Sequence, residues 1–126
     1  MVLVDSSVII DFLNRNLYRD DITKLIVNEE IVTTPIIIME VLQGIKDDSV
    51  YEKVKSFMDS LPLILADYND HILSANIYRG CRKKGKTIRK SIDCLIASIA
   101  INHDLVLFAN DKDFKHVAEC FELRLY

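Results

Sequence analysis

Four acidic side chains occupy positions where they could act together on a ligand: Asp5, Glu40, Asp93 and Asp111. Asp5 follows the apolar run 2–4, which reads as a strand buried on both faces. Asp111 likewise follows an apolar run at 105–109. Ligands of open α/β sheets bind beyond the carboxyl ends of the strands. If these two parallel strands are neighbours, Asp5 and Asp111 share one crevice at that edge.

The other two acids interrupt apolar helices. Asp93 is the only charge in the helical run 92–101 and lies in its first turn, and Glu40 stands in the middle of the apolar run 36–42. A buried carboxylate is costly unless it is paired or binds a metal ion. Simpler interpretations remain open: Asp5 as an N-cap, Asp93 as a complement to the helix dipole, and Glu40 on an exposed stripe.

Several carboxylates held close together repel one another and raise each other's pKa. A hard divalent cation removes this conflict, because Mg²⁺ prefers oxygen ligands and retains water for a phosphate substrate. Such a site can activate water and neutralise charge that develops on a phosphodiester. The three histidines lack metalloprotease spacing and an evident nucleophile partner.

Alternating strands and helices position these acids. Strands are expected at 2–4, 30–34, 61–65, 105–109 and 122–126. Helices are expected from Ser6 or Ser7, which could cap the first one, and at 21–28, 35–44, 49–60, 69–84, 91–101 and 114–118. The helix at 35–44 is apolar nearly all round, which predicts that it is largely buried. This order predicts one α/β domain over residues 1–126 with a mostly parallel sheet.

The composition excludes several classes of protein. No apolar run is long enough to span a bilayer, and no signal peptide is evident. The three cysteines are odd in number and lack CxxC spacing, which predicts a reduced, cytoplasmic protein without a zinc cage.

Basic residues are concentrated in one segment of an otherwise acidic chain whose net charge is −3. Segment 79–90 holds seven of the 16 lysines and arginines and no acidic residue. This distribution favours local contact with a polyanion. The alternative is a solvated helix end whose charges complement the helix dipole. The candidate phosphate-binding residues nearest the Asp93 helix are Arg82, Lys83, Lys84, Lys86, Arg89 and Lys90.

Four stretches in this order resemble the PIN domain, and more narrowly the VapC toxins of toxin–antitoxin pairs. They are the segment 5–11, the helix 35–44 with Glu40, the segment 85–97 with Asp93, and the segment 110–114. The resemblance covers essentially the whole chain. It implies a three-layer α/β/α fold with a mostly parallel sheet of four to five strands.

The same resemblance implies an endoribonuclease dependent on Mg²⁺ or Mn²⁺, with Asp5, Glu40, Asp93 and Asp111 as its metal-binding and catalytic acids. Ser6 and Ser7 are expected to supply supporting hydroxyls. A homodimer inhibited by a VapB-type antitoxin is also implied. One departure is Ala109, where many members carry Thr or Ser. Asp113 competes with Asp111 for the fourth position, and Asp111 is favoured because it is closer to the strand end.

Two other functions remain open. A PIN-fold module could bind RNA or a partner without cleavage. A phosphoacceptor receiver domain would also bind Mg²⁺ at strand ends, but it requires an acidic pair after the first strand, where this chain has Asp5 alone.

Overall fold

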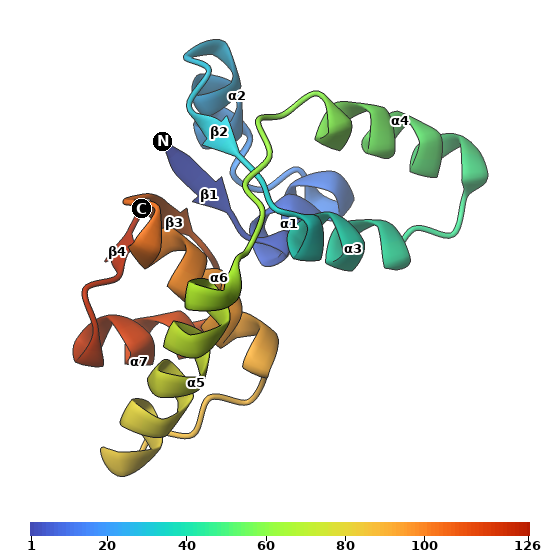
Figure 1. The fold of residues 1–126 in the computed structure, drawn as a ribbon. Coiled ribbons are helices and arrows are strands. Elements are labelled where there is room, and N and C mark those ends of the chain that lie inside the picture. Colours follow the sequence, from blue (N-terminus) through green and yellow to red (C-terminus); the bar gives the residue numbers. More distant parts are fainter. The chain divides into compact units, whose positions relative to one another are not determined.

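The computed structural model describes residues 1–126, which divide into two compact units, Met1–Leu65 and Ala66–Tyr126. The first unit contains the elements β1 to α4, and the second contains α5 to β4 (Figure 1). In both units a parallel strand pair is accompanied by helices, as the sequence predicts for an α/β protein.

The first unit is built on β1 (Val2–Val4), whose residues are all buried, and β2 (Ile31–Val32). The strands pair in parallel, with Val2 opposite Ile31 and Leu3 opposite Val32. Two helices connect them, α1 (Ser6–Arg15) and α2 (Arg19–Val27). The chain continues through α3 (Pro35–Gln43) and α4 (Asp48–Asp59). Thr34 and Pro35 begin α3, because proline at the first helical position sacrifices no helical hydrogen bond.

Two expectations for this unit are wrong. Segment 61–65 forms no strand: its only ladder contact is one parallel bridge between Leu63 and Thr33. Pro62 lacks a backbone N–H, so the segment can donate to a neighbouring strand at fewer positions. Helix α3 is not largely buried, since only Ile37 and Val41 are fully covered and Met39 is 49% exposed.

The second unit begins with α5 (Tyr68–Lys83), which starts in a capping box formed by Asp67 and Asp70. Helix α6 (Ser91–Asn102) packs against it, and most of its apolar side chains are fully buried. Strand β3 (Val106–Phe108) pairs in parallel with β4 (Arg124–Leu125), and α7 (Lys112–Cys120) connects them.

Helices α5 and α7 approach each other closely where Gly80 meets the ring of Phe121. A Cβ atom on Gly80 would lie 2.8 Å from Cζ of that ring, so only glycine fits without a shift. The segment between α5 and α6 is anchored by Ile88, which is 1% exposed. This anchor fixes the backbone of the residues that lead into α6 and Asp93.

Candidate metal centre and nucleic-acid interface

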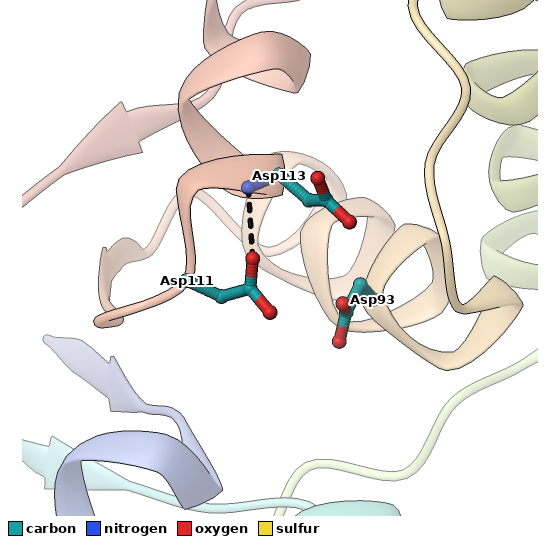
Figure 2. A group of neighbouring side chains, drawn as sticks. All are labelled: Asp93, Asp111 and Asp113. Atoms are coloured by element: carbon teal, nitrogen blue, oxygen red, sulfur yellow. Dashed lines mark hydrogen bonds between the residues drawn. The ribbon is translucent and has the colours of Figure 1, made fainter.

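Three carboxylates of the second unit form a cluster: Asp93, Asp111 and Asp113. One oxygen from each lies within 4.8 Å of the others. Figure 2 shows the three side chains gathered beside the first turns of α6 and α7. The structure thus brings together Asp93 and Asp111, two of the four predicted acids, and adds Asp113 to them. We call these residues the acid cluster.

Asp111 is the N-cap of α7, and its side chain accepts the N–H of Asp113 at 2.9 Å. Helix α7 therefore begins two residues earlier than the sequence predicts. Asp93 lies in the first turn of α6 and is 5% exposed. Both carboxylates lie near helix N-termini, where the dipole favours negative charge. The second oxygen of Asp111, Oδ2, accepts a hydrogen bond from Nη2 of Arg89 at 3.1 Å.

Asp113, which the sequence left as the alternative to Asp111, belongs to the acid cluster together with it. It is 3% exposed, and its Oδ2 accepts hydrogen bonds from the backbone N–H and the Nε of Arg89, both at 3.1 Å. Burial opposes its ionisation, but the hydrogen bonds and charge of Arg89 outweigh that effect and lower the pKa of Asp113. The sequence carried a signal for this position in the spacing of Asp111 and Asp113. A residue two positions after an N-cap aspartate lies at the same helix N-terminus, so the two carboxylates are close together.

The acid cluster suits a divalent cation. Its donors are all carboxylate oxygens, the set that Mg²⁺ and Mn²⁺ prefer. One oxygen from each carboxylate lies within 4.8 Å of the other two, so the three carboxylates can approach a common cation. Arg89 compensates only part of the negative charge of three carboxylates.

The first unit holds the other two predicted acids with their predicted hydroxyls. Asp5 is 4% exposed and caps α1, accepting the N–H of Ser7 at 3.2 Å and its Oγ–H at 2.5 Å. The cap is thus Asp5, and the expectation that Ser6 or Ser7 caps α1 is wrong. The Ser6 hydroxyl instead donates to Oε1 of Glu40 at 3.1 Å. Each supporting hydroxyl therefore contacts one predicted acid.

The basic segment has two kinds of members. Lys83, Lys84 and Lys90 are exposed, and the Arg82 guanidinium stacks 5.6 Å from the ring centre of Tyr78. Lys86 instead forms an ion pair with Glu119, and Arg89 binds Asp111 and Asp113. Two of the six candidate phosphate-binding residues are therefore engaged by acidic side chains.

An apolar cavity of about 250 Å³ lies in the first unit between α1, α2 and α4. Its rim is partly exposed, with Leu13 at 42%, Ile26 at 41% and Phe57 at 37%. Lys53 is the only charged residue that lines it.

No helix of the chain combines the length and apolar character needed to cross a bilayer.

Comparison with known proteins agrees with this architecture. A family model described as "PIN domain" matches residues 2–119. Ribonuclease VapC11 of Mycobacterium tuberculosis is 31% identical over 129 aligned residues, which cover 98% of this chain and 96% of that protein.

Two solved structures share the fold. The toxin–antitoxin complex VapBC2 of Rickettsia felis, bound to a promoter DNA fragment, contains a chain with a TM-score of 0.81 and 22% identity, covering 100% of this chain and 98% of that one. A DNA-bound VapBC complex of Salmonella typhimurium gives a TM-score of 0.79 at 18% identity, with 99% and 96% coverage. The predicted PIN-like α/β fold is confirmed, and the chain belongs to the PIN-domain family.

Proposed function

We propose that this chain is a divalent-cation-dependent endoribonuclease and the toxin of a VapBC-type toxin–antitoxin pair. The observation that carries this proposal is the acid cluster, in a chain that is 31% identical to a ribonuclease over almost its whole length. We further propose that both compact units act as one nuclease domain over residues 1–126, since the family model extends across both of them.

The residue roles in this proposal follow the chemistry of each group. Asp5, Glu40, Asp93 and Asp111 hold Mg²⁺ or Mn²⁺, and Asp113 anchors the segment that carries Arg89. The bound cation supplies Lewis acidity toward water and the scissile phosphate. Ser7 orients Asp5, and Ser6 orients Glu40, because each hydroxyl donates to its carboxylate.

The RNA backbone binds the basic segment in this proposal. Lys83, Lys84 and Lys90 are exposed cations, and this segment leads directly into the helix that carries Asp93. Contacts of lysine and arginine with phosphate position a nucleic acid without selecting its sequence. The proposed substrate class is RNA, because the relative that is 31% identical is a ribonuclease. Hydrolysis of its phosphodiesters would inhibit translation and growth in the cytoplasm.

The apolar cavity between α1, α2 and α4 is the proposed antitoxin site. An amphipathic helix would cover its partly exposed rim by inserting apolar side chains, the usual helix-in-groove mode of recognition. The solved relatives in their toxin–antitoxin complexes support this occupant. Helix α3, whose Met39 is 49% exposed, is the proposed homodimer contact.

The test is cleavage of total RNA by the purified protein with Mg²⁺, with Mn²⁺ and with EDTA. Asp93→Asn is expected to abolish metal-dependent fragments and to weaken Mn²⁺ binding at least about a hundredfold, since even outer-shell changes cost 10–100-fold. Asp104→Asn is the matched control, because Asp104 has a side chain 94% exposed and adopts a left-handed backbone that asparagine tolerates.

Circular dichroism must show that both variants remain folded. Discrete cleavage that Asp5→Asn and Asp93→Asn both retain would contradict the site assignment. A folded, antitoxin-free preparation that binds RNA but does not cut it would favour the binding module, and Ala109 would then be the first residue to examine.

A further inference from the structure

Arg89 distributes its hydrogen bonds over two members of the acid cluster. Its backbone N–H and Nε both donate to Oδ2 of Asp113. Its Nη2 contacts both oxygens of Asp111, at 2.9 and 3.1 Å. The side chain is nevertheless 60% exposed. The Nε atom is therefore bonded to a buried carboxylate, while Nη2 contacts a carboxylate that is 18% exposed.

The two attachments differ in strength. Asp113 receives two bonds from Arg89, one of them from the backbone, so this link survives movement of the guanidinium tip. Asp111 is contacted only by Nη2, which donates to both of its oxygens, and no backbone group of Arg89 supports this contact. Oδ1 of Asp111 already accepts the N–H of Asp113, so the Nη2 contact occupies much of its remaining acceptor capacity.

A cation at the acid cluster and Nη2 of Arg89 need the same lone pairs of Asp111. They also repel each other, because both are positive and close together. On the basis of the proposed nuclease function, we propose that Arg89 is a counter-ion that a divalent cation displaces from Asp111. The Asp113 link retains the side chain nearby, and the released Nη2 then binds a phosphate of the RNA substrate.

This arrangement couples metal loading to RNA binding. Without the cation, Arg89 neutralises part of the charge on the acid cluster. With the cation present, the guanidinium becomes an additional phosphate ligand between Lys86 and Lys90, both in the basic segment. Arginine suits this exchange, because its planar fork matches carboxylate and phosphate equally well.

The first experiment measures Mn²⁺ binding by calorimetry without RNA. Arg89→Gln is expected to bind Mn²⁺ about tenfold more tightly than the wild type, within the 5–150-fold range typical of coupling between two ligands. The matched control is Lys115→Gln, an exposed residue of α7 with the same charge change. Unchanged or weaker Mn²⁺ binding in Arg89→Gln, relative to that control, would overturn the proposal.

A second experiment uses the wild-type protein and so does not depend on folding of a variant. Arginine side-chain NMR signals are followed while Mg²⁺ is added. The Arg89 guanidinium is expected to lose its Nη contact and to retain the protected Nε–H that is bonded to Asp113. An Arg89 signal that stays unchanged as the acid cluster saturates would contradict displacement.

RNA binding tests the second half of the exchange. With Ca²⁺ as a non-hydrolytic cation, Arg89→Gln is expected to reduce the salt slope by about 0.7, the value of one phosphate contact on a single strand. A slope equal to that of Lys115→Gln would overturn phosphate binding by Arg89. Failure of the nuclease proposal would look different from failure of the Arg89 proposal. In the first case the wild-type protein does not cleave RNA, whatever the effect of Arg89→Gln on Mn²⁺ affinity.

Discussion

The hydroxyl of Ser6 donates to Oε1 of Glu40 across 3.1 Å, although 34 residues separate them in the sequence. The contact joins the first turn of α1 to the second half of α3, two helices that pack together. It restricts the Glu40 side chain, which is half-buried.

Ser6→Ala is therefore expected to lower the cleavage rate roughly 10–100-fold, the usual cost of losing a group that orients a metal ligand. Ser6→Thr keeps the hydroxyl and should recover most of the rate. The measurement is single-turnover cleavage at saturating Mn²⁺, with the melting temperature as a check on folding. Equal rates in the alanine and threonine variants would show that Ser6 does not orient Glu40 for catalysis.

The exposed end of α5 should contribute RNA affinity without base selection. Replacing Lys83 and Lys84 with alanine is expected to weaken RNA binding and to reduce the salt slope by about 1.4, since each phosphate contact on a single strand contributes about 0.7. Filter binding at several salt concentrations measures this slope. Alanine at Lys24 and Lys46, two exposed lysines of the first unit, is the charge-matched control. A similar loss in that control would indicate a general charge effect.

Asp70 should determine part of the acid stability of the second unit. It is fully buried and accepts hydrogen bonds from Asn102 at 2.8 Å, from the Asp67 N–H at 3.0 Å and from His103 at 3.3 Å. Burial opposes its ionisation, but these partners outweigh that effect and lower the pKa of Asp70 below its ordinary 3.8.

Because the folded state holds the lower pKa, Asp70 stabilises the protein above about pH 4 and loses this effect as the pH falls through its folded-state value. Asp70→Asn should flatten the decline of unfolding free energy below pH 4, and Asp70→Ala should cost about 2–3 kcal/mol at pH 7. Urea melts across pH measure both, with the exposed Asp48→Asn as control. An unchanged pH profile in Asp70→Asn would contradict this role.

The apolar cavity of the first unit gives a prediction with a control one residue away. Ile26 lines the cavity, whereas its neighbour Val27 is 73% exposed and does not. Ile26→Asp should abolish binding of the cognate antitoxin, because a charge would enter the apolar contact, while Val27→Asp should bind normally. Co-purification of the pair measures this, and RNA cleavage by free Ile26→Asp confirms folding. Normal antitoxin binding by Ile26→Asp would place the partner elsewhere.

Local patterns were enough to predict most of the elements. Buried strands at residues 2–4 and 106–108, and the start of α3 at Thr34 and Pro35, depend on composition and local chain conformation. The burial of α3 was predicted wrongly for the same reason: an apolar helix surface is visible in the sequence, but the elements available to cover it are not.

The sequence by itself determined the α/β class, the parallel strands and the identity of Asp5, Glu40, Asp93 and Asp111 as the acids to examine. The tertiary structure alone decided the partners of these acids. It assigned Ser6 to Glu40, and it placed Arg89 beside Asp111 and Asp113. Side-chain pairs distant in the chain depend on how helices pack and where loops are anchored, and spacing along the sequence does not encode that geometry.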